Sequence, residues 1–477
     1  MILSELPTEV IVEILLCCDV FGVINIGETC KHLHEISCSK SVWISLIIDL
    51  KLRGVIDGRL VPQPTQLSLS ELVGLAQRVL HGPKSWRPLP GAIELTPEVL
   101  RYVSLGPCTA RPAYCRLLPD GRHFLLNNDG TLECWEVERN QRVWQSPLSK
   151  SGLEILSFAL EQNELGVVMI AATCLQAGMF ANASRAPRVY VDVSELDLRN
   201  LDNIIHTQHQ LYPGGFDVLD LTVLAVSGDL VLFHSIVGGF LLIDWRTGTA
   251  GFLKAHHRTF KLALGATFMA MLSETRLRFF DTASLRSHLS VVDPDALLDS
   301  ARIVFLEELR PFLKHRLQSP VAEPTSSTEL STGGLSLELA IYVYPNPLAH
   351  GTYRIWLVQS ATNGRSPKVS YLHRLSLVYP PQSPSTPPVL YSTQSAPSVV
   401  SSGHAAQISF SGHSVAAQRS ARVDAAAAAS VVDRHHVQGQ MELVHLPRAV
   451  TPTVALYSGA LTYLEYATGK VTIVYYV

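Results

Sequence analysis

Cysteine and histidine occur close together near the start of this 477-residue sequence, in the run Cys30-x-His32-x-His34. Thiolate and imidazole are ligands that zinc prefers, so these residue types could form a metal site. Alternate residues of a helix lie about 200° apart around its axis, so Cys30 and His32 are directed to different sides. The adjacent histidines at 256–257 and 435–436 are more typical of loops or strand ends than of ligand sets. We therefore expect no metal site.

Motifs of catalytic and nucleotide-binding sites are absent from the sequence. It contains no G-x-S-x-G elbow, P-loop, G-x-G-x-x-G fingerprint or H-E-x-x-H pair. We therefore expect a protein that is not an enzyme, with no catalytic residue and no cofactor. An enzyme with a catalytic pocket in a β domain is the alternative, and no motif supports it.

Composition indicates a folded protein rich in buried strands. Hydrophobic residues make up 47% of the chain, charged residues make up only 17%, and mean hydropathy is +0.20. The net charge of -3 gives no reason to expect nucleic acid or an anionic membrane as a partner. No positively charged segment precedes the first apolar run, so we expect no secretory signal.

The cysteines indicate the redox compartment. All eight lie in the first 174 residues, and no two form a C-x-x-C pair. This spacing fits neither a disulfide framework nor a zinc ribbon, so we expect a reducing compartment, the cytoplasm and/or the nucleus. The longest apolar stretch, residues 165–180, is interrupted by glycine and glutamine and is too short to span a membrane. We interpret it as a buried pair of strands.

A first helix is expected to begin at Pro7. Proline suits the first position of a helix because its missing N–H would be unpaired there. Val10 and Ile14 then share one face of the helix, and Ile11 and Leu15 share the next. The helix is therefore apolar on two neighbouring faces.

Further short helices are expected through residues 30–36 and from residue 41 onward. Three or four such helices, apolar on almost every face, cannot bury themselves within fifty residues. They must pack on the rest of the chain or on a partner. A separate helix is expected to begin at Ser68, which has capping-box spacing to Glu71, and to end at Gly82.

From about residue 90 the apolar pattern changes from helical to strand-like. Asn128-Asp129-Gly130 lies between two apolar runs and predicts a tight hairpin. Units of strand, turn and strand recur irregularly to the end of the chain, which is typical of a β-propeller. We expect about seven blades, with six or eight also open, and the strand at 471–477 closing the ring with one near 93–104. An array of two-sheet β-sandwiches is the structural alternative.

The sequence thus predicts an α+β multidomain protein, in which a small all-α domain precedes a large all-β domain. We expect a helical domain at 1–50, a helical linker at 51–90 and a propeller-like, target-binding domain at 91–477. Biased composition predicts disordered insertions in the β domain near residues 316–334, 380–403 and 416–440.

The N-terminal residues resemble the F-box family in type and spacing. The resemblance covers residues 6–47 without an insertion, about a tenth of the chain, and is carried by Leu6, Pro7, Glu9, Val10, Ile14, Leu15, Cys30 and Trp43. The sequence departs from the family pattern at Cys18, Val20 and Leu33, where leucine, proline and tryptophan are common. All three departures keep an apolar side chain, so the packing chemistry of the pattern is retained.

The resemblance implies a function in ubiquitin transfer. F-box helices bind a Skp-type adaptor, which links them to a cullin in an SCF ubiquitin ligase, and a following propeller presents an unknown target protein. The chain would then be a substrate receptor and a non-catalytic subunit. A scaffold that binds the adaptor without directing ubiquitination is the alternative. Glu9 is expected to act by orienting the first helix, and the residues expected at the adaptor contact are Leu6, Pro7, Glu9, Val10, Ile14, Leu15, Leu33 and Trp43.

Overall fold

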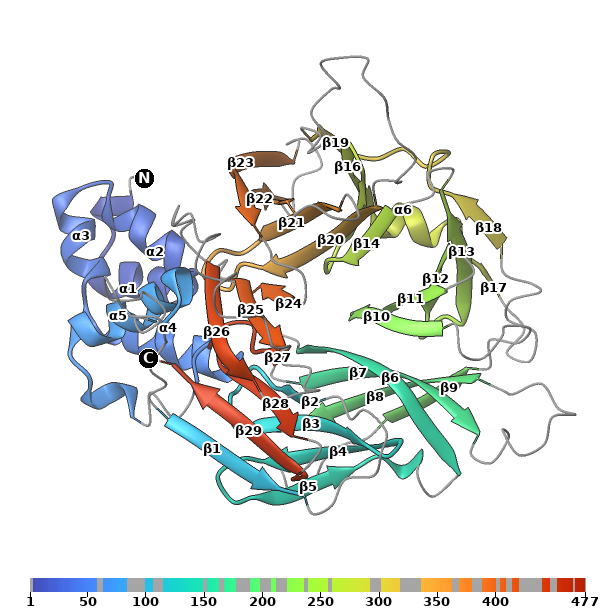
Figure 1. Ribbon diagram of the computed structural model, residues 1–477. Helices are drawn as coiled ribbons and strands as arrows, with labels where there is room; N and C mark the ends of the chain where they lie inside the picture. The colour runs from blue at the N-terminus through green and yellow to red at the C-terminus, as the bar shows by residue number, and fades with distance from the viewer. Residues whose placement is uncertain are drawn as a thin grey trace, which may run out of the picture.

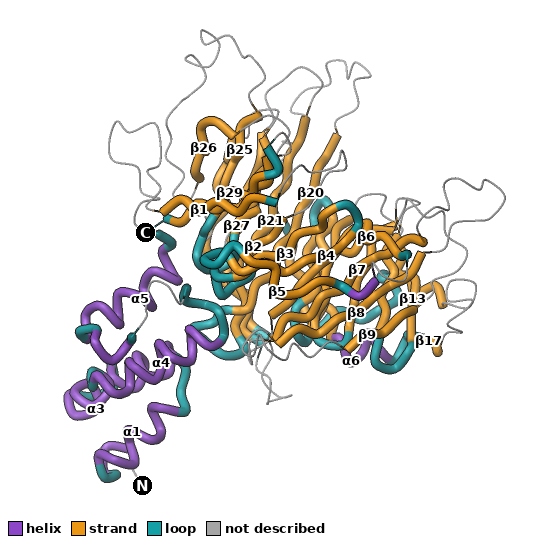
Figure 2. Tube along the Cα trace, turned by 90° about the horizontal axis from the view of Figure 1, so that it is seen from below, coloured by secondary structure: helices purple, strands orange, loops and turns teal. Residues whose placement is uncertain are grey.

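The helices of the N-terminal residues gather on one side of a larger body of strands (Figures 1 and 2). The computed structural model of the chain describes residues 3–57, 63–83, 99–105, 115–148, 152–162, 167–176, 189–197, 207–211, 221–235, 239–255, 260–291, 302–317, 336–362, 369–379, 388–399, 404–408, 414–419, 440–446, 453–465 and 468–476. The first strand of the β domain in these ranges is β1 (Val99–Ser104).

The helical part consists of short segments, as predicted. Its elements are η1 (Leu3–Glu5), α1 (Thr8–Leu16), α2 (Val20–Gly27), α3 (Lys31–Ser37), α4 (Lys40–Leu52), η2 (Pro64–Gln66) and α5 (Leu69–His81). Apolar side chains from α1 to α5 meet in one core, so α5 packs with the four preceding helices. A further helix, α6 (Thr282–Arg286), lies between strands of the β domain.

The predicted capping box begins α5. The backbone N–H of Ser68 donates to Glu71 Oε2 at 2.7 Å, and the N–H of Glu71 donates to Ser68 Oγ at 3.4 Å. These bonds satisfy two of the N–H groups that the first turn of a helix leaves without a partner. Gly82 ends the helix with a φ of 76°, which suits glycine because it has no Cβ. Both ends of the predicted helix are confirmed.

Antiparallel sheets begin the β domain. The first contains β2 (Cys115–Leu117), β3 (His123–Asn128), β4 (Thr131–Glu136) and β5 (Gln141–Gln145). The second contains β6 (Leu153–Gln162), β7 (Val167–Gln176), β8 (Val189–Asp197) and β9 (Thr207–Leu211). The third contains β10 (Leu221–Ser227), β11 (Leu230–Ser235), β12 (Gly239–Asp244) and β13 (Thr249–Lys254), and β13 also pairs with β17 (Ser290–Val291) and, in parallel, with β18 (Arg302–Phe305).

Four further sheets follow along the described part of the chain. One contains β14 (Phe260–Leu264), β15 (Phe268–Ser273), β16 (Arg276–Asp281) and β19 (Leu313–Arg316). The next contains β20 (Ser336–Pro345), β21 (Thr352–Thr362), β22 (Val369–Val378) and β23 (Val389–Val399). A three-stranded sheet follows, with β24 (His404–Ile408), β25 (Ser414–Arg419) and β26 (Gln440–Leu446). The last contains β27 (Thr453–Val454), β28 (Leu461–Glu465), β29 (Lys470–Tyr475) and β1.

The sheets follow one another round a ring (Figure 1). The strands of the described residues form seven sheets in all. β1 pairs antiparallel with β29, from Val99 opposite Tyr475 to Ser104 opposite Lys470, so the first and last strands share one sheet. The predicted closure of the ring is confirmed, and so is the predicted class of N-terminal helices followed by a propeller-like all-β domain. The number of blades stays a prediction.

Apolar layers between neighbouring sheets form the hydrophobic core of the β domain. Phe124 and Leu126 on β3 pack with Ile473 of the closing sheet. Leu125, between them, points to the other side and packs with Ile170 of the β6–β9 sheet. Successive side chains of a strand point to opposite faces, so the β2–β5 sheet contributes to two layers. This sheet is therefore stabilised by the neighbours on either side of it.

The predicted hairpin turn joins β3 to β4. Asn128 pairs with Thr131, and the two residues between them, Asp129 and Gly130, have φ values of 49° and 79°. Positive φ at both central residues matches the right-handed twist of the strands. A Cβ at Gly130 would lie 2.9 Å from the Cβ of Glu154, so the turn also needs glycine for space.

In the described part of the apolar stretch at 165–180, residues 167–176 form one strand, β7, where the sequence predicted a pair. β7 lies inside its sheet, between β6 and β8. Both of its faces are covered, since Ile170 belongs to one apolar layer and Ala171 to the other. A strand buried on both faces has no polar alternation, and the continuous run was therefore mistaken for two strands.

Predicted insertions overlap described strands in three places, the first of which is Arg316 at the end of β19. The disordered loop predicted at 380–403 is wrong for β23, whose backbone pairs with β22. β23 is the outermost strand of its sheet, where a proline such as Pro397 is tolerated because one side of the strand has no ladder to complete. The insertion predicted at 416–440 overlaps the ends of β25 and β26. The remaining parts of the predicted insertions, at 318–334, 380–387, 400–403 and 420–439, lie outside the described residues.

One carboxylate joins the β6–β9 sheet to the next sheet. Glu161 on β6 accepts hydrogen bonds from Ser227 Oγ at 2.9 Å and from the N–H of Gly228 at 2.8 Å. Burial raises the pKa of the Glu161 carboxyl above its ordinary value, although both hydrogen bonds act to lower it. The charged form is therefore less stable in the folded chain than in the unfolded chain.

We expect Glu161→Gln to change the pH dependence of stability. Because the folded pKa is raised, the stabilisation from Glu161 is full below about pH 4.3, the ordinary value for glutamate, and is lost as pH rises through the folded pKa. Glutamine does not titrate and can still meet both groups, so the free energy of unfolding of the variant should rise relative to wild type as the pH is raised above about 4.3. Urea unfolding across this range measures the difference, and parallel curves would contradict the assignment.

Candidate functional site

Helix α1 divides its apolar side chains between two faces, as the sequence predicted. Ile11 and Leu15 are fully buried among the other helices, whereas Val10 is 42% exposed and Ile14 is half-buried. The spacing of four residues places the members of each pair one turn apart on the same side of the helix. One face of α1 therefore belongs to the core and the other is open to solvent.

The open face of α1 extends from one end of the helix to the other. Pro7 at the N-cap and Cys17 at the C-cap are exposed, three residues before Val10 and three residues after Ile14. We call Pro7, Val10, Ile14 and Cys17 the α1 stripe. Exposed acidic side chains at residues 9 and 13 lie along one edge of it. An uncharged centre with a charged rim is the pattern of a protein-binding surface.

Local signals fix the start and the end of α1. The carbonyl of Pro7 accepts from the N–H groups of Val10 at 3.0 Å and Ile11 at 3.1 Å, which closes the first turn. Glu9 lies in that turn, where a carboxylate is favoured by the positive end of the helix. Asp19 then begins α2, because its Oδ1 accepts from the N–H of Gly22 at 2.6 Å.

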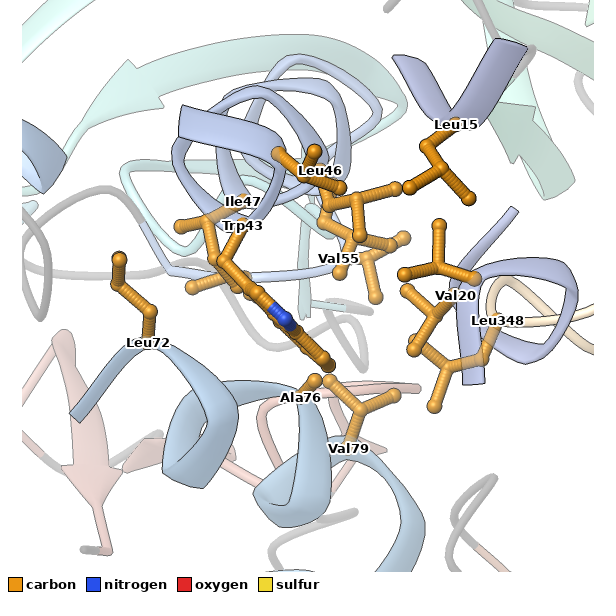
Figure 3. Packing of buried hydrophobic residues seen from close by; sticks show 14 of the residues in the cluster. Leu15, Val20, Trp43, Leu46, Ile47, Val55, Leu72, Ala76, Val79 and Leu348 are labelled. Carbon is orange, nitrogen blue, oxygen red and sulfur yellow. The ribbon is translucent and has the colours of Figure 1, made fainter. Parts of the chain in front are cut away.

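Other predicted contact residues lie within the helix core (Figure 3). Leu15, Leu33 and Trp43 are at most 5% exposed, and Leu6 is half-buried against the same core. The indole Nε1 of Trp43 donates to the carbonyl of Ser37 at 3.0 Å. In the free chain these residues hold the helices together. Their contact with an adaptor stays a prediction.

The structure brings three of the predicted residues, Pro7, Val10 and Ile14, together on the α1 stripe, with Glu9 at its edge. The sequence prediction did not include Cys17, although helical spacing from Ile14 could have found it. It also did not include Ile24 on α2, which is 38% exposed.

Metal and membrane sites have no support in the described part of the chain. Its histidine, cysteine and acidic residues form no group of three or more that could hold a metal ion. In the same region, Cys38 Sγ lies 3.7 Å from His34 Nε2. Where helices are described, none is long and apolar enough to cross a membrane.

The two faces of α1 should differ in their effect on stability. We expect Leu15→Ala to lower the free energy of unfolding by about 2 to 5 kcal/mol, because it opens a cavity in the core. Val10→Ala should change it by less than about 0.5 kcal/mol, because the side chain already meets water. Denaturant unfolding followed by helix circular dichroism measures both. Equal losses would contradict the division into a core face and an open face.

Comparisons with known proteins agree with the helical part. Residues 3–45 match the family model described as the F-box domain, and a comparison with curated proteins found no match. Similar solved structures include a complex of the SREBP–SCAP binding domains of fission yeast, at 12% identity over 66% of this chain and 80% of that chain with a TM-score of 0.33. Hsv2 of Kluyveromyces lactis matches at 11% identity over 59% and 85% with a TM-score of 0.25, and the WD40 domain of fission yeast SCAP at 9% over 80% and 75% with a TM-score of 0.30. The propeller-like architecture of the β domain is given by the order of its own sheets. The matched residues include the whole of α1, α2 and α3, and the N-terminal part of the chain is an F-box domain.

Proposed function

We propose that the chain is an F-box substrate receptor of an SCF-type cullin ubiquitin ligase. The observation that supports this most is the α1 stripe, where Val10 and Ile14 meet solvent on a helix whose opposite face is buried. The stripe lies in an F-box domain, and F-box domains generally bind a Skp-type adaptor. In this proposal the adaptor covers the stripe and links the chain to a cullin.

Burial of the α1 stripe supplies part of the free energy of this contact. Fully burying a valine or isoleucine side chain contributes about 1.5 to 3 kcal/mol. Val10 and Ile14 are already partly covered, so together they have about 2 kcal/mol left to contribute. Acidic residues at 9 and 13 lie beside the stripe, where they favour a partner with basic side chains at the rim.

The β domain presents the target protein in this proposal. A receptor acts by proximity, since it holds a lysine of the target near an enzyme that carries ubiquitin. The helices lie on one side of the strand domain (Figure 2), which separates adaptor and target on the chain. The chain is then a non-catalytic subunit, and the identity of the target is open.

We also place the protein in the cytoplasm, the nucleus or both. Cys17, Cys30 and Cys38 are free thiols exposed on the helices. Exposed thiols stay reduced in these compartments, whereas secreted proteins tend to oxidise them. A receptor of an SCF-type ligase must be in the same compartment as its adaptor and cullin.

Truncation of the α1 stripe should weaken adaptor binding. We expect Val10→Ala/Ile14→Ala in the full chain to raise the Kd for a purified Skp-type adaptor by roughly 30-fold, which corresponds to about 2 kcal/mol. The fold should survive, because neither side chain is fully buried. Calorimetry or a pull-down with both purified proteins measures the change.

A matched control makes the same truncations elsewhere. Val291→Ala/Ile303→Ala removes the same atoms from β17 and β18, where the two side chains are 81% and 49% exposed. This variant should bind the adaptor as wild type does. A wild-type chain that is folded but binds no adaptor would overturn the proposal.

A ubiquitin-transfer assay distinguishes a substrate receptor from a scaffold that binds the adaptor without directing ubiquitination. For a receptor, a protein that co-purifies with the chain should be ubiquitinated in a reaction with adaptor, cullin and the ubiquitin-loading enzymes. Val10→Ala/Ile14→Ala should reduce that transfer in proportion to its loss of adaptor binding. Adaptor binding without transfer to any co-purified protein would favour the scaffold.

A further inference from the structure

A turn of the β domain completes the core of the F-box helices. The turn joins β20 to β21, and its residue Leu348 is fully buried. Leu348 belongs to the same apolar cluster as Val20, Val23 and Trp43, although more than 300 positions separate it from them. Figure 3 shows Leu348 beside Val20 at the edge of this core. The core is therefore built from two domains.

Hydrogen bonds fix the same turn to two helices. The N–H of Phe21 on α2 donates to the carbonyl of Leu348 at 3.0 Å. The N–H of His350 donates to Asp19 Oδ2 at 2.6 Å. Arg53, at the end of α4, donates from Nη2 to the carbonyl of Pro347 at 3.1 Å. Three hydrogen bonds thus accompany the apolar contact that Leu348 makes with the helix core.

Asp19 has two functions at this junction. Its Oδ1 accepts from the N–H of Gly22 and begins α2, while its Oδ2 accepts from the N–H of His350 in the turn. Both bonds are 2.6 Å long, and bonds to a charged acceptor are stronger than neutral ones. A carboxylate has two acceptor oxygens, whereas an asparagine has one and a serine is too short to reach both groups. The start of α2 is therefore bonded to the β domain through one side chain.

The turn holds its shape through its own bonds. The N–H of Leu348 donates to Asn346 Oδ1 at 3.1 Å, and the N–H of Asn346 donates to the carbonyl of Thr352 at 2.8 Å. Thr352 Oγ1 donates to the carbonyl of Ala349 at 2.8 Å, and Gly351 has a φ of 67°. The strands on both sides are long and paired over their whole length. Leu348 is thus presented to the helices in a fixed position.

We propose that the β20–β21 turn is the positioning element of the F-box helices, with Leu348 and Asp19 as positioning residues. The turn sets one orientation of α2 and α4 relative to the propeller-like domain, and these helices reach full stability only when β20 and β21 are folded. The consequence for ubiquitin transfer, a fixed geometry between adaptor and target, rests on the proposed function. The structural coupling does not, and its test needs no adaptor.

Hydrogen exchange of the full chain tests the coupling. We expect Leu348→Ala to speed amide exchange in α2 and α4 by about a hundredfold, since a leucine-to-alanine cavity loosens the elements around it. Exchange in β6–β9 should stay as in wild type. Leu232→Ala is the matched control, because Leu232 is equally buried but lies between the third sheet and the β14–β16 strands. It should leave α2 and α4 protected.

A variant of Asp19 separates its two functions. Asp19→Ser keeps a good N-cap for α2 but cannot reach His350. It should speed exchange in residues 346–352 and in α2 by about tenfold. Leu348→Met, which conserves volume, should retain wild-type exchange. Wild-type protection of α2 in both Leu348→Ala and Asp19→Ser would overturn the proposal.

The orientation of the F-box helices relative to the β domain is measured directly with spin labels. Labels at Glu35→Cys on α3 and Val291→Cys on β17 use two exposed positions, in a background where Cys17, Cys30 and Cys38 are serine. Wild type and Leu348→Met should give one narrow distance distribution by dipolar spectroscopy. Leu348→Ala should broaden it. A distribution that is equally narrow in all three would contradict the positioning function, whatever the adaptor result.

Discussion

The pairing of β1 with β29 is the interaction on which the rest of the structure depends. It completes the sheet that packs through Val103 and Ile473 against β2–β5, and so it gives the first and last parts of the β domain a shared core. Sheets buried on both faces need a neighbour on either side, and only a closed ring provides this for every sheet. The helices depend on it too, because Arg78 on α5 donates to the carbonyl of Tyr476, directly after β29.

The F-box helices use their apolar side chains in two ways. One set forms a core with Leu348 from the β domain, and the other leaves Val10 and Ile14 on the surface of α1. The helical segment is apolar on almost every face because it supplies both this core and this surface. Neither the core nor the surface alone would need apolar residues on every face. Asp19 stands between them, with one oxygen on α2 and the other on the β20–β21 turn.

Local signals in the sequence were sufficient wherever a structure is determined by nearby residues. The capping box of Ser68 and the hairpin at Asp129 were predictable because each is a bond or a dihedral angle within four residues. β23 was missed because a strand at a sheet edge is held by the backbone of its neighbour, which Ser- and Pro-rich composition does not reveal. The burial of Trp43 was missed because a surface position and a core position on a short helix have the same residue types.

Ring closure also governs the order in which the chain can fold. Ser104 and Lys470 are partners in one sheet but are 366 positions apart. Synthesis at about 5 to 20 residues per second therefore leaves β1 without its partner for about 20 to 75 s. During that time Leu100 and Tyr102, which remain partly exposed even in the finished sheet, lie on an open strand edge that can pair with another chain. The newly made protein thus passes through a period of risk of aggregation, in which a chaperone that shields strand edges would have its greatest effect.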